Sequence, residues 1–200
     1  MARHFKLTNE TKINIFGVTL FRIECAIDCK WAKVGDKGGW VEKEENIQGG
    51  DAWVSGNAEV YGNARVYGDA RVYGNARVYG NARVYGNAEV YGNARVYGDA
   101  WVYGNAWVYG DAWVYGNARV YGNAWVSGNA DYCCFQQFGS RMGTTTVFRE
   151  KGGGVRIRCC CFSGNIEEFA AKVEQTHGDN EYGKVYKAII EVIKLRFNVK

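Results

Sequence analysis

Arginine and tyrosine are the side chains of this chain whose type and spacing could do chemistry, because they recur at fixed places in a short pattern. Between Val54 and Ala130 the sequence repeats units of the form V-Y-G-N-A-R, with arginine, tryptophan or glutamate before each valine. Arginine can bind phosphate and carboxylate groups through two parallel hydrogen bonds. Aromatic rings can stack on a base or attract a cation. The pattern favours binding of a planar anion without turnover.

Arginines of successive coils would lie next to each other if 18 residues make one coil. Arg65 would lie under Arg83, and Arg77 under Arg95, at the spacing of neighbouring strands, about 4.8 Å. Like charges directly opposite are destabilising, so tyrosine rings, nearby acids such as Glu59, or a bound anion should offset them. The alternative is a solvated surface whose arginines lie on tyrosines. We name as candidate ligand-binding residues Arg65, Tyr67, Arg83, Tyr85, Arg77 and Arg95, and from the C-terminal part Arg156, Arg158 and His177.

The elements that position these side chains follow from the six-residue period. Side chains alternate along an extended segment, so Ala64 and Val66 would point inward while Arg65 and Tyr67 point outward. Gly68 and the residue after it would form a corner, since glycine accepts a positive φ. Three corners close a triangular coil, and the 13 units make about four coils. The sequence therefore predicts a mainly β fold, a left-handed parallel β-helix.

The 18-residue period assigns the residues before the valines to three outer faces, named here by their first members. The Trp53 face holds Trp53, Arg71, Glu89, Trp107 and Trp125, the Glu59 face holds Glu59, Arg77, Arg95 and Trp113, and the Arg65 face holds Arg65, Arg83, Trp101 and Arg119. Tyrosines would run beside them as three ladders. The tryptophans gather in the later coils, and we expect them to pack against the C-terminal part or another subunit.

Three parts follow from this pattern: a capping module over residues 1–46, the β-helix over 47–130 and an α+β module over 131–200. The first part contains an expected hairpin around Gly17. A solenoid needs such caps, because its open ends would expose strand edges and apolar core.

The C-terminal module is expected to contain a β-hairpin and two helices. Two strands, near 147–148 and over 155–158, flank a glycine-rich loop. Asn165 would cap a helix that ends near Gly178. A second helix would run from about Asn180 to Phe197. One of its faces carries an apolar stripe that forms core or an oligomer contact: Tyr182, Val185, Tyr186, Ile189, Ile193 and Phe197.

The repeat resembles the hexapeptide repeat of left-handed β-helix proteins, most of which are acyltransferases and usually homotrimers. The wording V-Y-G-N-A, with a V-S-G-N-A variant at Val54 and Val126, is closer to hexapeptide-repeat proteins of phages, prophages and bacteria. Those proteins are often labelled as acyltransferases. The segments 33–46, 164–169 and 176–180 resemble their flanking segments. The resemblance covers nearly the whole chain and implies the fold more strongly than any function.

Acyltransferases of this class generally use a histidine as general base, which must reach the acceptor of the acyl group. The repeats contain no histidine and no inserted loop; the two histidines of the chain are His4 and His177. His177 lies between the expected helices, where a helix C-terminus favours a cationic ring. The resemblance therefore implies the fold without the chemistry, and we predict no enzyme and no catalytic residue.

The seven cysteines are in short clusters that fit the usual spacing of zinc ligands poorly. We predict buried free thiols on strands, with no metal and no cofactor. The alternative is a zinc site in which Cys25 and Cys29 meet others among Cys133, Cys134, Cys159, Cys160 and Cys161.

Composition limits the partners and the location. The net charge of +4 is mildly basic, and we expect no sequence-specific binding of nucleic acid. No apolar run approaches 18 residues and no signal-peptide pattern opens the chain, so we expect no membrane contact and a cytoplasmic location, in the host cell if a phage encodes the protein.

These observations lead to one hypothesis and two alternatives. The hypothesis is a non-catalytic protein of phage or prophage type that captures a small anionic ligand, such as a nucleotide signal, at clefts between the subunits of a homo-oligomer, with a trimer favoured. Such a sponge would serve counter-defence. The alternatives are a scaffolding solenoid that mediates oligomerisation or protein contacts, and a divergent acyltransferase that uses His177.

Overall fold

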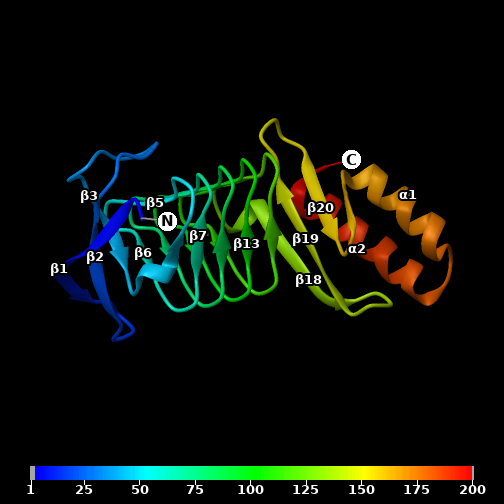
Figure 1. Ribbon diagram of the computed structural model, residues 1–200. Coiled ribbons are helices and arrows are strands. Elements are labelled where there is room, and N and C mark those ends of the chain that lie inside the picture. Colours follow the sequence, from blue (N-terminus) through cyan, green and yellow to red (C-terminus); the bar gives the residue numbers. More distant parts are fainter. Residues whose placement is uncertain (1–2, 200) are drawn as a thin grey trace.

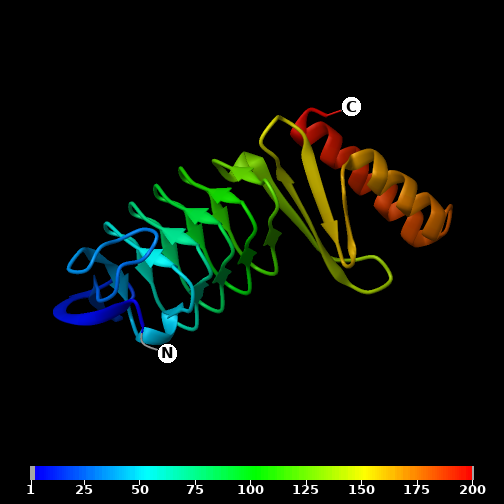
Figure 2. The ribbon, with the colours of Figure 1, turned by 45° about the horizontal axis from the view of Figure 1, so that its top comes forward.

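The molecule is a solenoid with a β-hairpin at one end and a sheet with two helices at the other (Figure 1). A computed structural model describes residues 3–199. Seen from a second direction, the coils of the solenoid lie one behind the other, and the helices stand beyond the last coil (Figure 2). One hydrophobic core runs from Phe5 through the solenoid to Phe148, and a second lies between the C-terminal sheet and its helices.

Three parallel sheets form the sides of the solenoid, and their strand register agrees with the predicted faces. The Glu59 face contains β3 (Lys37–Val41), β6 (Glu59–Val60), β9 (Arg77–Val78), β12 (Arg95–Val96) and β15 (Trp113–Val114). The Arg65 face contains β4 (Ile47–Gln48), β7 (Arg65–Tyr67), β10 (Arg83–Val84), β13 (Trp101–Val102) and β16 (Arg119–Val120). The Trp53 face contains β5 (Trp53–Val54), β8 (Arg71–Val72), β11 (Glu89–Val90), β14 (Trp107–Val108) and β17 (Trp125–Val126).

The predicted fold class is confirmed, and the solenoid has about five coils because β3 and β4 precede the valine repeats. The expectation of about four coils counted the repeats alone. Trp40 in β3 already pairs in parallel register with Glu59 of the next coil. A 3-10 helix, η1 (Glu44–Asn46), connects β3 to β4.

Alternation along the short strands separates the interior from the faces. Ala82 and Val84 are fully buried, while Arg83 and Tyr85 are half-buried on the outside, as predicted. Gly86 adopts a φ of +71° at the corner, and a Cβ there would lie 3.0 Å from the backbone nitrogen of the next corner glycine. The corner glycine is therefore required both by its φ and by the close stacking of the coils.

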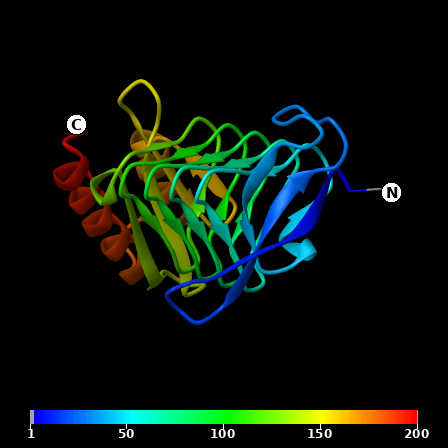
Figure 3. The same cartoon turned by 90° about the vertical axis from the view of Figure 1, so that its left-hand side faces the viewer.

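The N-terminal hairpin covers the first coil and extends the sheet of the Glu59 face (Figure 3). It consists of β1 (Phe5–Ile13) and β2 (Thr19–Cys25), joined around Gly17 with a φ of +77°. β2 pairs in antiparallel register with β3. The prediction of a hairpin around Gly17 is confirmed.

The C-terminal module contains a four-stranded antiparallel sheet, so the prediction of one β-hairpin was incomplete. After the 3-10 helix η2 (Asn129–Asp131) come β18 (Tyr132–Phe138), β19 (Gly143–Arg149), β20 (Val155–Cys159) and β21 (Phe162–Gly164). The predicted strands correspond to β19 and β20. The sequence of β18, YCCFQQF, lacks a clear alternation of polar and apolar residues because much of the strand borders an open groove.

The two predicted helices are present as α1 (Ile166–His177) and α2 (Glu181–Phe197). The Asn165 side chain accepts a hydrogen bond from the Glu168 backbone, and the Glu168 side chain accepts one in return from the Asn165 backbone. The predicted apolar stripe of α2 is buried from Tyr186 onward, but Tyr182 and Val185 are exposed. These two residues lie in the first turns and are not part of the core, so the alternative of an oligomer contact stays a prediction for them.

All seven cysteines are free, and their environments differ. Cys25 is buried, as predicted, whereas Cys160 and Cys161 are exposed in the turn between β20 and β21. The prediction of buried thiols was therefore wrong at this turn. Over residues 3–199 no three side chains of the metal-binding types form a cluster, and no helix in that range could cross a membrane.

Candidate functional site

The predicted arginine pairs lie on neighbouring strands in direct register. Arg65 pairs with Arg83 on the Arg65 face, and Arg77 pairs with Arg95 on the Glu59 face. Beside the first pair, the rings of Tyr67 and Tyr85 are stacked with centroids 4.7 Å apart. The stacked ladder continues along this face to Tyr103 and Tyr121.

The two pairs differ in how their charge is balanced. Glu59 is buried, and its carboxylate lies 3.5 Å from the Arg77 Nε and 2.8 Å from the Lys12 Nζ. In contrast, neither Arg65 nor Arg83 has a carboxylate within 4.0 Å among residues 3–199. The Arg65 face therefore retains uncompensated positive charge, while the second pair is partly neutralised within the protein.

Most of the outward arginines of the solenoid lie against tryptophan rings. The guanidinium carbons of Arg83 and Arg119 lie 4.8 and 4.2 Å from the Trp101 ring centroid, from the coils on either side. The expectation that arginines lie on tyrosines holds for Arg71, which lies 4.7 Å from the Tyr73 ring. Between consecutive coils, tyrosine rings cover one another, as Tyr67, Tyr85, Tyr103 and Tyr121 do.

The Tyr85 hydroxyl remains a hydrogen-bond donor over the physiological pH range. Burial, together with the neighbouring tyrosines Tyr103 and Tyr67, raises the pKa of Tyr85 to about 12. The positive charges of Arg119 and Arg83 act in the opposite direction and are the smaller effects. Tyr85 can therefore donate a proton in a hydrogen bond to an anion placed beside Arg83.

The three C-terminal candidates occupy different places. Arg158 lies over the Tyr121 ring at 5.9 Å, at the end of the ladder that begins at Tyr67. The Arg156 Nε instead lies 2.7 Å from a carboxylate oxygen of Glu150.

His177 lies in the last turn of α1, with its ring 5.6 Å from the Tyr186 ring and 5.9 Å from the Tyr182 ring. Within one chain, Arg158 is thus the C-terminal candidate that reaches the ladder of the Arg65 face. The meeting of the other two with that face across a subunit boundary stays a prediction.

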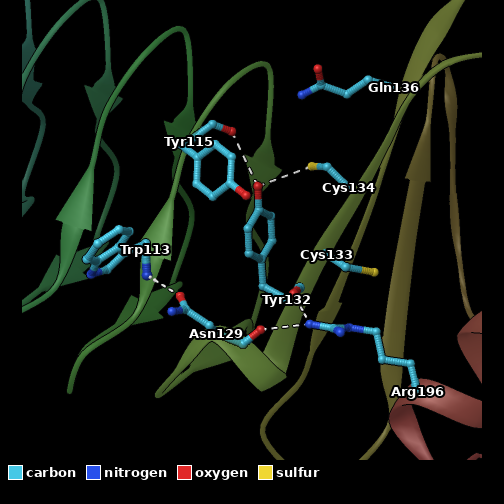
Figure 4. A pocket seen from close by; sticks show the side chains of 8 residues that line it. All are labelled: Trp113, Tyr115, Asn129, Tyr132, Cys133, Cys134, Gln136 and Arg196. Carbon is cyan, nitrogen blue, oxygen red and sulfur yellow. Dashed lines mark hydrogen bonds between the residues drawn. The ribbon is translucent and has the colours of Figure 1, made fainter.

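A groove that the sequence analysis did not identify lies between the last coil and the C-terminal module (Figure 4). Its volume is about 610 Å³. Its exposed aromatic wall is formed by Trp113 and Tyr115, with 41% and 48% of their surfaces exposed. The remaining lining residues are Asn129, Tyr132, Cys133, Cys134, Gln136 and Arg196. The one available signal was the position of Trp113 and Tyr115 near the end of the repeats.

The groove offers hydrogen-bonding groups and an aromatic surface. The Tyr132 hydroxyl donates to the Tyr115 carbonyl at 3.3 Å and lies 3.2 Å from the Cys134 Sγ. Burial raises the pKa of Cys133 to about 11, and burial also raises the pKa of Cys134. Both thiols are therefore protonated at neutral pH, which disfavours nucleophilic attack. The arrangement suits binding.

The repeats match a family model described as the YdcK beta solenoid repeat. The matched segments lie between residues 58 and 128 and are 58–74, 64–78, 70–86, 76–90, 88–104, 100–116 and 112–128. A comparison with the curated proteins found no match. The matched family describes the repeat fold, so the resemblance to phage proteins and to acyltransferases stays a prediction. The matched repeats and the three parallel sheets together identify the chain as a β-solenoid repeat protein of about five coils.

Proposed function

We propose that this protein is a non-catalytic binding protein that holds a small anionic ligand on the Arg65 face. One observation carries the proposal: Arg65 and Arg83 are in direct register and lack a carboxylate partner among the described residues. Arg77 and Arg71, by comparison, lie near Glu59 and Glu89. Two adjacent like charges destabilise a sheet, and a bound anion would remove that cost.

The geometry supports recognition of the ligand's anionic group more than recognition of a nucleobase ring. The Tyr67 and Tyr85 rings cover each other at 4.7 Å, so a base has no room between them. Their hydroxyls and the guanidinium edges are the groups available to a phosphate. Trp101 supports the Arg83 guanidinium group, which reduces the side-chain entropy lost on binding. A phosphate-bearing ligand, with a nucleotide as the leading class, fits this surface.

The finer form of the proposal concerns origin and assembly. The V-Y-G-N-A resemblance supports a phage or prophage protein that sequesters a nucleotide signal in the host cytoplasm as counter-defence. In a homotrimer, Arg156, Arg158 and His177 of one subunit would close a cleft over the Arg65 face of the next. The support is the positive charge of that face and the position of Arg158 at the end of its tyrosine ladder.

A thermal-shift screen tests the proposal. The screen would use inorganic phosphate, nucleotides, cyclic nucleotides and coenzyme A. A ligand at 100 times its dissociation constant stabilises the folded state by about 2.7 kcal/mol. We expect a phosphate-bearing compound to stabilise the protein and to be recovered unchanged. If acyl-coenzyme A is consumed and the reaction is lost in His177→Ala, the protein is an acyltransferase and the proposal fails.

A scaffolding role is the second candidate, and one surface favours it. Leu195 on α2 is 83% exposed, and Val192 on the same helix is also exposed. Exposed aliphatic side chains grouped on one helix are typical of a protein contact. A scaffold would give no stabilisation with any compound of the screen.

A further inference from the structure

The three sheets of the solenoid end differently at the C-terminal module. At the end of the Arg65 face, the Arg119 backbone N–H donates to the Thr146 Oγ1 of β19 at 3.2 Å. Near the end of the Trp53 face, the Lys151 backbone N–H donates to the Asn123 carbonyl at 3.0 Å. β19 and the turn after it therefore cover the ends of two of the three sheets.

The Glu59 face ends at β15 without such a covering strand. In the preceding coil, the Arg95 N–H donates to the Ala112 carbonyl at 2.9 Å, and the Tyr97 N–H donates to the Val114 carbonyl at 3.0 Å. At β15 the equivalent donors are the backbone N–H groups of Trp113 and Tyr115. Within residues 3–199 no strand follows β15 in this sheet to accept from them.

Side chains replace only part of the missing strand. The Trp113 N–H donates to the Asn129 Oδ1 at 2.9 Å, and the Tyr115 carbonyl accepts from the Tyr132 hydroxyl at 3.3 Å. The Tyr115 N–H has no acceptor in the described part of the chain. Unpaired backbone groups at a sheet edge can pair with another extended chain.

The charge at the β15 edge indicates which kind of extended chain could pair with it. Of the eight residues that line the groove, Arg196 is the one with a permanent charge. Its guanidinium group donates to the carbonyls of Asn129 and Tyr132, at 2.9 and 3.3 Å, and these neutral groups orient it without balancing its charge. Arg95, on the neighbouring strand of the same face, lies 4.7 Å from the Trp113 ring. The groove therefore favours an acidic occupant.

We propose that the β15 edge binds an extended acidic peptide segment of a partner protein, which adds as the next strand of the Glu59 face. A peptide carbonyl would accept from the Tyr115 N–H, and an acidic side chain would pair with Arg196. A peptide side chain would pack on the exposed ring of Trp113. This site lies on a different face from the proposed anion site.

Fluorescence anisotropy on the full-length protein tests this proposal with labelled synthetic peptides. The acidic probe is a short peptide in which glutamates flank alternating valine and threonine, and the control probe carries lysines in place of the glutamates. We expect binding of the acidic probe alone. Arg196→Gln should weaken it about tenfold or more, the loss expected for one hydrogen bond to a charged group, whereas the exposed Arg141→Gln in the β18–β19 turn should leave it unchanged.

A second measurement uses the unaltered protein, in case Arg196→Gln disturbs the fold. N-methylation of the peptide backbone at successive positions should alternate between loss and retention of binding, because only every second amide of a strand faces the sheet edge. No binding of the acidic probe, equal binding of both probes, or an N-methyl series without alternation would overturn the proposal. Sedimentation showing self-association that Arg196→Gln abolishes would assign the edge to a second copy of this chain and would also overturn it.

Discussion

Arg65 and Arg83 are direct neighbours on β7 and β10, and among the described residues neither guanidinium group has a carboxylate within 4.0 Å. On the Glu59 face, by contrast, the Arg77 Nε lies 3.5 Å from the Glu59 carboxylate. The repeat therefore contains two similar arginine pairs with different charge environments. This difference separates the Arg65 face, as a candidate anion site, from a repeat surface whose charges are balanced internally.

The first prediction concerns the solenoid interior. Val84→Asp should destabilise the middle coils by several kcal/mol, because it places a charge without a partner in a fully buried position. Tyr85→Phe, at the adjacent outward position, is the control and should change the free energy of unfolding little. Urea denaturation measures both. A Val84→Asp protein as stable as the parent would contradict the assignment of valines to the core.

The second prediction separates two reasons for the corner glycines. Gly122 has a φ of +67°, and a Cβ added there would meet open space, so Gly122→Ala should cost about 1–2 kcal/mol from backbone strain alone. Gly86→Ala should cost more, because its Cβ would also lie 3.0 Å from the Gly104 nitrogen. Gly154→Ala, in an open loop without a positive φ, is the control. Equal unfolding free energies for the two corner variants would argue against close stacking.

The third prediction concerns alkaline pH. Folding raises the pKa of Tyr85 from 10.0 to about 12 and that of Cys133 from 9.0 to about 11. Between the unfolded and the folded pKa of each group, the unfolded chain has lost a proton that the folded chain retains. The free energy of unfolding therefore falls as pH rises through this range. We expect a constant free energy of unfolding below about pH 8 and a decline from about pH 9 to 12, the range set by these pKa values.

Cys133→Ala and Tyr85→Phe should each reduce the slope of that decline, which urea denaturation across this pH range would measure. A slope unchanged in both variants would show that these groups titrate alike in the folded and unfolded states.

The fourth prediction concerns assembly. Sedimentation should show a stable oligomer, with a trimer expected, at micromolar concentration. The reason is the exposed apolar surface of α2, which includes Val192 and Leu195. Leu195→Glu should weaken the assembly if α2 forms the contact. A monomer at this concentration would remove the proposed clefts between subunits.

Much of the solenoid could be predicted from the sequence, because a strict period determines which side chains share a face. The register of Arg65 with Arg83 and of Glu59 with Arg77 follows from an 18-residue coil. The support of Arg83 by Trp101 could not be predicted in this way, since it depends on side-chain rotamers. The six-residue period also does not reveal that consecutive tyrosine rings stack on one another and so cover each other's faces.

The groove could not be predicted, because it depends on how two modules meet. Residues of the groove come from the end of the repeats at β15, from η2, from β18 and from the distant Arg196 on α2. No short sequence pattern relates these segments. β18 itself was missed, since its cysteines and glutamines give neither a clear strand pattern nor a repeat. The open edge of β15 appears only when the hydrogen bonds of the last coil are followed in the structure.

Calorimetric titration of a phosphate-bearing ligand from the thermal-shift screen tests the central claim most directly. We expect Arg83→Ala to lose about 1.5–3 kcal/mol of binding free energy, with the fold retained because the side chain points outward. Arg71→Ala, whose guanidinium group lies 3.9 Å from Glu89, is the matched control and should bind as the parent does. Arg156→Ala should weaken binding only if a neighbouring subunit completes the site. Equal affinity of Arg83→Ala and the parent protein would contradict the placement of the ligand on the Arg65 face.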